Sequence, residues 1–247
     1  MFESRSGVFL IAGLGFFGLS FLVMAVLPWA IYYKEPEQTV EQLAARGIIP
    51  EFVDLAERYP EQFKQYFGAP TYATYVEALR LGHQVYVAEA CWHCHSQFIR
   101  PVSNEDLRWG PVSHALEYQN ELQRPVLFGT RRVGPDLSRE AGRRSNDWHV
   151  AHFWQPTSVV PSSVMPPYRW FFDGQGYPNK RGLAVITYVQ FLGSWLKEYP
   201  YFHGEGPLGP LPAPTPADAP IARGATSGET DSVDAPIVGA ATAGVLP

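Results

Sequence analysis

The sequence predicts a mainly α-helical protein that has one N-terminal transmembrane helix and a helical domain outside the membrane. Two observations carry this prediction: a long uncharged apolar run near the N-terminus, and apolar residues that recur at helical spacing in several later segments. The net charge is −5 and no basic run is longer than a pair. Nucleic acid is therefore not an expected partner.

The apolar run covers residues 7–33, and its 27 residues include no charged side chain. About 20 apolar residues suffice to cross the hydrocarbon of a bilayer, whereas a cleavable signal peptide has a shorter apolar region. Trp29, Tyr32 and Tyr33 close the run, as an interfacial aromatic belt does. We expect an uncleaved anchor over residues 1–34 and a lipid bilayer as its partner; the alternative is a buried helix of a soluble protein.

The two cysteines of the chain, Cys91 and Cys94, precede His95 in a C-x-x-C-H motif. This spacing is typical of c-type haem attachment, in which both thiols bond to the haem and the histidine is the proximal iron ligand. The alternatives are a redox-active disulfide and a zinc site, which would need further thiolate or histidine ligands. The motif predicts one covalently bound haem c. Because such haem is attached outside the cytoplasm, the domain should face the periplasm from a bacterial inner membrane, as a single-pass protein.

Two expected helices flank the rest of the domain, one over 75–90 and one over 183–197. The first leads into the haem motif, and Gly82 on it would let Tyr188 of the second approach closely. Small cytochromes c cross two such helices beside the haem. We therefore expect a class I-like cytochrome c domain with long loop insertions; two generic amphipathic helices would give much the same pattern.

Met165 is the only methionine outside the anchor and the initiator position, and two prolines follow it. A thioether on a loop stiffened by prolines could serve as the distal iron ligand. The competing ligands are His149 and His152, three residues apart on a helix that should begin near Ser145. His/Met ligation raises the reduction potential and fills both axial positions, which favours electron transfer over catalysis at the haem.

Pro135, in a Gly-Pro-Asp-Leu run, should accept a hydrogen bond through its carbonyl from the free ring N–H of His95. An ordinary turn is the alternative explanation of this run. The haem propionates also need donors, and the available side chains are Arg100, Arg131, Arg132, Arg143, Arg144 and Trp148.

The chain should have four parts. Residues 1–34 form the anchor and 35–79 a helical spacer with short helices near 40–45 and 52–59. The monohaem cytochrome c domain covers 80–203. Residues 204–247 form a disordered tail, because 24 of these 44 residues are Gly, Pro or Ala and none is aromatic.

The run CWHCHSQFIRPV at 91–102 resembles the monohaem cytochrome c subunit of cbb3-type cytochrome c oxidases, the CcoO/FixO family. Further stretches of likeness bring the resemblance to about residues 80–195; they lie at 132–137, 145–152 and 158–166. The resemblance implies a non-catalytic electron-transfer subunit. It would pass electrons from a dihaem or soluble cytochrome c donor to the haem-copper catalytic subunit, and Met165 would take the distal ligand position.

Two features depart from this family, namely the long 35–79 region and the low-complexity tail. Other functions therefore stay open: the monohaem subunit of a nitric oxide reductase, a free membrane-anchored cytochrome c carrier, and a free-standing haem enzyme or sensor. The Ser96–Pro101 run favours the oxidase over the reductase. An enzyme or sensor would need an open sixth position on the iron, so the role of Met165 separates it from the others.

Overall fold

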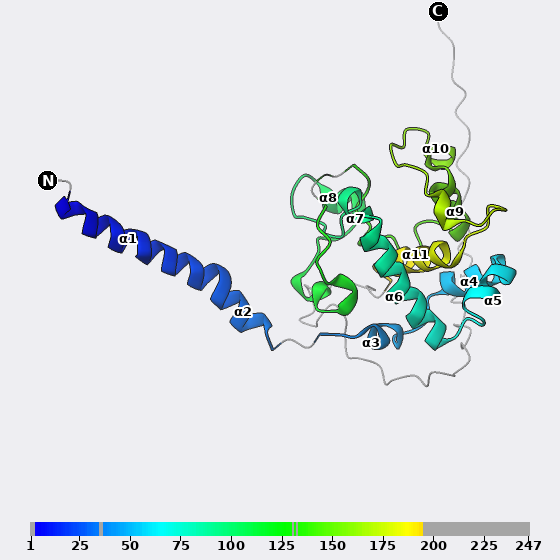
Figure 1. The fold of residues 1–247 in the computed structure, drawn as a ribbon, viewed down its shortest axis with the longest axis horizontal. Coiled ribbons are helices and arrows are strands. Elements are labelled where there is room, and N and C mark those ends of the chain that lie inside the picture. The colour runs from blue at the N-terminus through cyan, green and yellow to red at the C-terminus, as the bar shows by residue number, and fades with distance from the viewer. Residues whose placement is uncertain (1–2, 35–36, 130, 132, 195–247) are drawn as a thin grey trace, which may run out of the picture.

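The computed structural model describes residues 3–34, 37–129, 131 and 133–194 (Figure 1). Helices account for most of the ordered backbone, and the only β-type pairing among the described residues is two isolated bridges. The predicted fold class, mainly helical with one N-terminal apolar helix, is confirmed.

The N-terminal helix is continuous through α1 (Glu3–Phe21), the π-helical turn η1 (Leu22–Val26) and α2 (Leu27–Tyr32). The wide turn lies just before Pro28, whose ring would otherwise crowd the carbonyl one turn earlier and which has no N–H to donate. The apolar segment spans 28 residues, or about 42 Å of helix, against a hydrocarbon core of about 30 Å. It is therefore long and apolar enough to cross a membrane.

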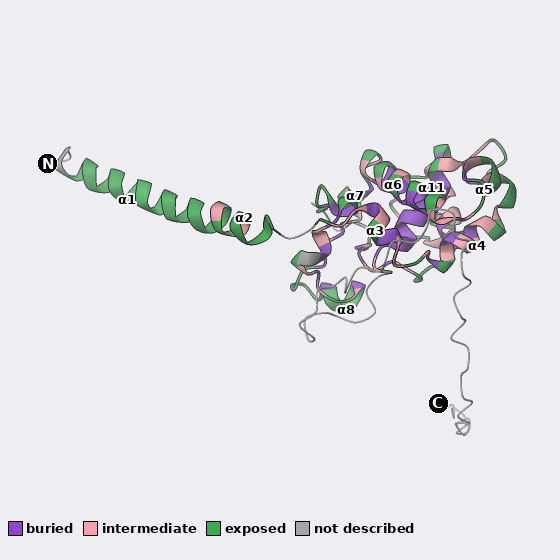
Figure 2. Ribbon diagram, turned by 90° about the horizontal axis from the view of Figure 1, so that it is seen from below, coloured by how far each residue is buried: buried purple, intermediate pink, exposed green. Residues whose placement is uncertain are grey.

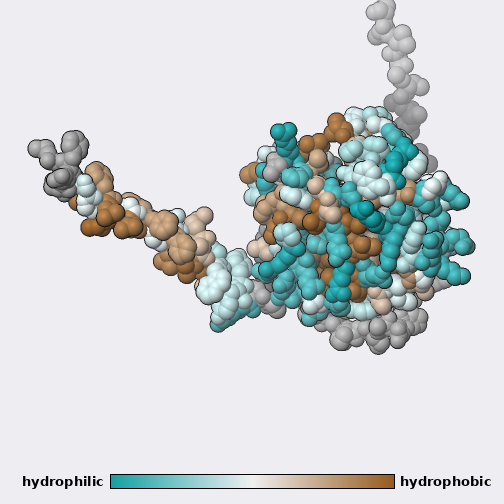
Figure 3. Space-filling model, in the orientation of Figure 1, coloured by the Kyte–Doolittle hydropathy of each residue, from teal (hydrophilic) through white to brown (hydrophobic). Residues whose placement is uncertain are grey.

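This helix extends away from the remainder of the protein, and its side chains are exposed along its length (Figures 1 and 2). Figure 3 shows hydrophobic residues along it, whereas hydrophilic residues cover most of the visible face of the domain. An apolar surface of this extent is unfavourable in water, so the helix needs a lipid or protein environment.

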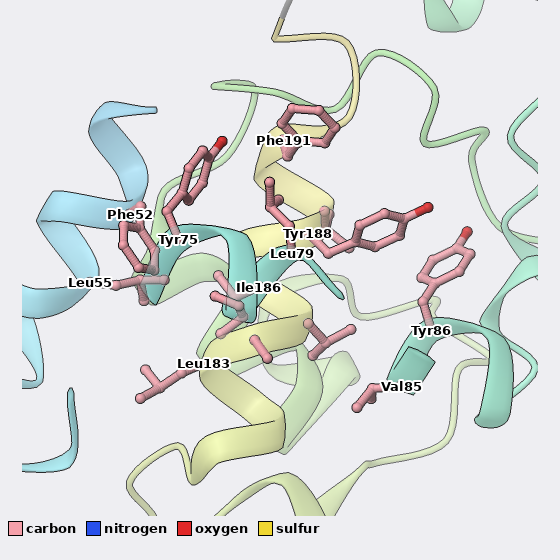
Figure 4. Close-up of a cluster of buried hydrophobic side chains, with 14 of the residues drawn as sticks. Phe52, Leu55, Tyr75, Leu79, Val85, Tyr86, Leu183, Ile186, Tyr188 and Phe191 are labelled. Atoms are coloured by element: carbon pink, nitrogen blue, oxygen red, sulfur yellow. The ribbon is translucent and has the colours of Figure 1, made fainter. Parts of the chain in front are cut away.

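The domain is built around two helices, α6 (Tyr72–Ala88) and α11 (Lys180–Phe191). A capping box in which Thr71 and Thr74 bond to each other's backbone N–H begins α6. The Asn179 side chain accepts two backbone N–H groups at the start of α11. From Gly182 onward every residue of α11 is buried, so this helix forms the centre of the core (Figure 4).

The two helices touch backbone to backbone at Gly82. A Cβ atom at this position would lie 2.1 Å from the carbonyl oxygen of Ala184 and 2.6 Å from Cβ of Tyr188. One turn further along α6, the rings of Tyr86 and Tyr188 pack edge to face with centroids 5.4 Å apart. The crossing predicted from Gly82 and Tyr188 is confirmed.

The ends of both helices differ from the predicted ones. The first ends at Ala88 rather than at residue 90, because Ala90 takes a left-handed conformation (φ 55°) that turns the chain into the haem motif. The second begins at Lys180 and ends at Phe191, where the backbone of Leu192 becomes extended. Residues 195–197 of the predicted helix lie outside the described residues.

Three short helices before α6 join the same core: α3 (Val40–Ala44), α4 (Pro50–Arg58) and α5 (Pro60–Tyr66). Phe52 of α4 packs its ring 5.2 Å from that of Phe63 and 5.0 Å from that of Tyr75. The expected boundary between residues 79 and 80 falls inside α6. Which parts fold independently stays a prediction, and the expected tail lies outside the described residues.

Shorter elements connect α6 to α11 and complete the domain. In chain order they are α7 (Cys91–Cys94), α8 (Glu105–Trp109), η2 (Ala115–Tyr118), η3 (Glu121–Gln123), α9 (Asn146–Trp154), α10 (Pro156–Val159) and η4 (Arg169–Phe171). A β-bridge between Gln38 and Asn120 ties the loops around η3 to the segment before α3. The helix expected to begin near Ser145 is α9, and Ser145 Oγ accepts the N–H of Trp148 as its N-cap.

Substituting Gly82 by alanine should separate α6 from α11, because the new methyl group would overlap main-chain atoms that cannot rotate away. We expect Gly82→Ala to lower the free energy of unfolding by about 1–3 kcal/mol or more, measured by thermal unfolding of the detergent-solubilised chain. Gly174→Ala is the matched control, since nothing lies within 4 Å of a Cβ there. Equal stability of the two variants would contradict the close crossing.

Candidate haem site

The C-x-x-C-H motif forms the short helix α7 and the residue after it. His95 N–H donates to the carbonyl of Cys91 over 2.8 Å, which brings the histidine back over the first cysteine. The thiol of Cys91 is buried and that of Cys94 is exposed, and both are free. Burial raises the pKa of Cys91 to about 12. The exposed side chain of His93 stacks on Trp92, so it faces solvent as predicted.

The backbone of the loop at residues 134–137 holds the imidazole of His95. Its Nδ1 lies 3.0 Å from the carbonyl oxygen of Pro135, which is the contact predicted from the Gly-Pro run. Because this contact occupies Nδ1, the lone pair left to bind a metal is that of Nε2. Burial lowers the pKa of His95, while the Pro135 carbonyl and Asp136 act to raise it. The ring is therefore neutral at pH 7, which is the form that ligates iron.

Gly134 lets this loop reach the ring. A Cβ atom at Gly134 would lie 2.3 Å from Cε1 of His95 and 2.7 Å from its Nδ1. The N–H of Gly134 donates to the carbonyl of Cys94 over 3.0 Å, and the N–H of Leu137 donates to that of Ser96 over 3.1 Å. The loop thus pairs with the chain on both sides of His95, and this fixes the orientation of the imidazole.

Gln97 joins the haem motif to the rest of the domain. The sequence indicated no role for it beyond its place in the 91–102 run. It is 1% exposed. Its amide nitrogen donates to the hydroxyl of Tyr188 over 3.1 Å, its amide oxygen accepts from Gln123, and its carbonyl accepts from Tyr118. One buried residue therefore connects α11, η2 and η3 with the segment that holds His95.

Asp136, next to Pro135, is also fully buried. Its carboxylate accepts the N–H of Phe98 and the N–H of Ser138, each over 2.9 Å. The second bond is an Asx turn, a local signal that a Gly-Pro-Asp sequence could have given. The first bond spans 38 positions, and no sequence pattern indicates it.

The loop that carries Met165 lies against the same core. Met165 is half-buried, and its N–H donates to Ser163 Oγ over 3.2 Å. Three residues later, Tyr168 N–H donates to the carbonyl of Phe153 in α9 over 2.8 Å. Burial raises the pKa of Tyr168 to about 12, with smaller contributions from Cys91 and Cys94. Tyr168, at the end of this loop, thus contacts α9 and lies near enough to α7 for its thiols to affect the pKa of Tyr168. That Met165 binds iron stays a prediction.

The alternative distal ligands, His149 and His152, are both neutral histidines in α9. Burial, His152 and Arg144 lower the pKa of His149 to about 3, and burial together with His95 lowers that of His152 to about 4. His149 Nε2 and His152 Nδ1 are buried and have no hydrogen-bond partner among the described residues. The influence of His95 on His152 places α9 beside the haem motif. The spectrum of Met165→Ala separates Met165 from these two histidines as the distal ligand.

The predicted propionate donors lie in two parts of the chain, residues 100–132 and residues 143–148. Arg100 forms an ion pair with buried Glu105, and the guanidinium of Arg144 lies 5.1 Å from the ring centre of Trp148. Arg132 lies outside the described residues.

With two free thiols, a neutral imidazole whose Nε2 is left for a metal, and a methionine loop on the same core, the donors present fit a covalently attached haem.

A family model described as the mono-heme subunit of cytochrome c oxidase, FixO, matches residues 61–193, which is more than half of the chain. The chain belongs to this family. The matched range holds α6, the C-x-x-C-H motif, the loop around Pro135, Met165 and α11, so the resemblance stated from the sequence is confirmed. No curated protein matches the chain. At the level of the family, the protein is a monohaem cytochrome c subunit of a cbb3-type oxidase.

Glu140, in the turn that precedes α9, should make stability depend on pH. Burial raises its pKa from 4.5 to about 6, although Arg143 and Arg144 act against the shift. The folded protein thus binds this proton more tightly than the unfolded chain does. The resulting stabilisation is full below pH 4.5 and is lost as the pH rises through 6.

We therefore expect Glu140→Gln to increase the free energy of unfolding at pH 7 by up to about 2 kcal/mol and to give no increase at pH 4. Denaturant titrations of the two proteins at several pH values would measure this. Glu57→Gln, at an exposed position, is the control. A gain at pH 7 that persists unchanged at pH 4 would contradict the assignment to Glu140.

Proposed function

We propose that this protein is a membrane-anchored c-type cytochrome with a single haem, which relays electrons to the haem-copper catalytic subunit of a cbb3-type oxidase. The observation that supports it most strongly is the His95–Pro135 contact beside two free thiols. This arrangement occurs in a chain of the cytochrome c oxidase mono-heme family. The alternatives, a nitric oxide reductase subunit or a free membrane-anchored carrier, have no comparable support.

Each residue has a defined part in this proposal. Cys91 and Cys94 bond covalently to the haem, and His95 Nε2 provides the proximal iron ligand. The Pro135 carbonyl holds Nδ1–H, which fixes the plane of the ring and increases its electron donation to the metal. Met165 provides the distal ligand from its proline-stiffened loop. When bound, haem c supplies a one-electron carrier.

The proposed ligand set would suit electron transfer. With both axial positions filled by protein ligands, no site is open to a substrate. The backbone bonds that pair the 134–137 loop with residues 94–96 hold His95 in one orientation. A bound haem would thus have a proximal ligand that needs little rearrangement. The protein would then have no reaction of its own and would act as the electron-transfer subunit of the complex.

The location follows from the anchor and from haem attachment. We propose that α1–α2 crosses the bacterial inner membrane once and that the domain faces the periplasm, where c-type haem is attached. The apolar helix supports the crossing. There the domain would accept electrons from a dihaem or soluble cytochrome c donor.

The first test is a reduced-minus-oxidised optical spectrum of the protein purified through an affinity tag from its native membranes in mild detergent. We expect a c-type band together with b-type haem signals, because a haem-copper core should accompany this subunit. A c-type band alone, in a preparation free of partner haems, would favour an independent carrier. Absence of a c-type band would overturn the haem assignment.

The second test concerns the distal ligand. In Met165→Ala the covalent haem should remain, whereas the low-spin spectrum and the high reduction potential should be lost because one axial position opens. Val164→Ala, one residue away and 76% exposed, is the matched control and should leave the spectrum unchanged. A normal low-spin spectrum in Met165→Ala, with its loss in a His149 or His152 variant, would instead identify a histidine as ligand.

A further inference from the structure

A small cavity lies between the turns η2 and η3 and the end of α11. It leaves about 10 Å³ of room for the centre of a water molecule, close to the least that one water requires. Its walls are formed by Gln97, Glu117, Tyr118, Gln123, Ser138, Arg139 and Leu192. Six of these seven side chains carry a polar group to which a water molecule could bond.

Gln123 and Ser138 each bring to this cavity a buried polar atom that has no hydrogen-bond partner among the described residues. These atoms are Gln123 Oε1 and Ser138 Oγ. A buried amide or hydroxyl left without a partner costs about 1–3 kcal/mol. Atoms in this state in a well-packed domain indicate a bound water or ion.

The amide orientation of Gln123 follows from its neighbours. Its nitrogen donates to Gln97 Oε1 over 2.8 Å, the nitrogen of Gln97 donates to the Tyr188 hydroxyl over 3.1 Å, and that hydroxyl donates to the carbonyl of Leu122 over 3.3 Å. The Tyr188 hydroxyl also lies 3.2 Å from Gln97 Oε1. Because the amide nitrogen of Gln123 is paired with Gln97, Oε1 is the amide atom of Gln123 that still needs a donor.

The charges around the cavity exclude an ion. Glu117 and Arg139 both line it, and they pair with each other over 2.8 Å while almost entirely buried. The Arg139 guanidinium would repel a cation in the cavity, and the Glu117 carboxylate would repel an anion. Neither kind of ion would therefore gain net attraction there. A neutral molecule of the smallest size, able both to donate and to accept, fits the space and the partners.

We propose that this cavity binds one ordered water molecule, which donates to Gln123 Oε1 and hydrogen-bonds to Ser138 Oγ. The water joins the turn η3 to the loop that carries Pro135 and Asp136. It also completes the series of hydrogen bonds that runs through Gln97 to Tyr188. This site is independent of which partner receives electrons from the haem.

The test is a structure of the membrane complex, at a resolution that shows ordered internal waters. We expect a density peak within hydrogen-bond distance of both Gln123 Oε1 and Ser138 Oγ. An empty cavity, while other internal waters are visible, would overturn the proposal. So would a direct hydrogen bond between Gln123 and Ser138, or a peak whose coordination distances are those of a metal ion.

A pair of variants tests the partners of the water. Ser138→Ala removes one partner without filling the space, so the peak should be lost or strongly weakened. Ser162→Ala, at an exposed position away from the cavity, is the control and should leave the peak unchanged. An undiminished peak in Ser138→Ala would overturn the assignment of Ser138 as a partner. If that variant does not fold, the density in the unaltered protein still decides whether the water is present.

Discussion

The backbone contact of α6 with α11 at Gly82 is the constraint on which the haem site depends. It sets the spacing of the two helices. Tyr86 lies one turn after Gly82 and Tyr188 one turn after Ala184, so this spacing also determines where their hydroxyls lie. The hydroxyl of Tyr86 donates to the carbonyl of His95, and that of Tyr188 meets the side chain of Gln97. Figure 4 shows both hydroxyl ends pointing to the same side, away from the aliphatic side chains. The crossing thus fixes the backbone of the motif through two polar contacts that need no contribution from the haem.

Burial has the largest effect on the ionisable groups near the motif. It lowers the pKa values of His95, His149 and His152, so that the imidazoles are neutral at physiological pH. The Pro135 carbonyl and Asp136 act in the opposite direction on His95 and do not outweigh burial. Because His95 is neutral without a metal, no proton would have to leave before this residue bound iron.

The sequence predicted those parts of the site that depend on local patterns. Gly82, Pro135 and the N-cap at Ser145 were found because a close approach, a turn and a helix start each require particular residue types at fixed spacing. The role of Gln97 and the bond from Asp136 to Phe98 were not predicted, because they depend on segments far apart in the chain. In the same way, the amphipathic pattern of α4 showed that one face is buried without showing that α5, α9 and α11 pack against it. The ligation by Met165 rests on the same kind of local pattern and stays a prediction.

The short connection between the anchor and the core limits how far the domain can move. Val40 is buried in α3, seven residues after Tyr33 at the end of the apolar helix, and seven residues reach at most about 25 Å. With α1–α2 in a bilayer, the domain is confined to a thin layer at the membrane surface. Encounters with other proteins of that membrane then take place in two dimensions, at an effective concentration set by this tether. A donor dissolved in the surrounding compartment must instead diffuse to that surface before it can transfer an electron.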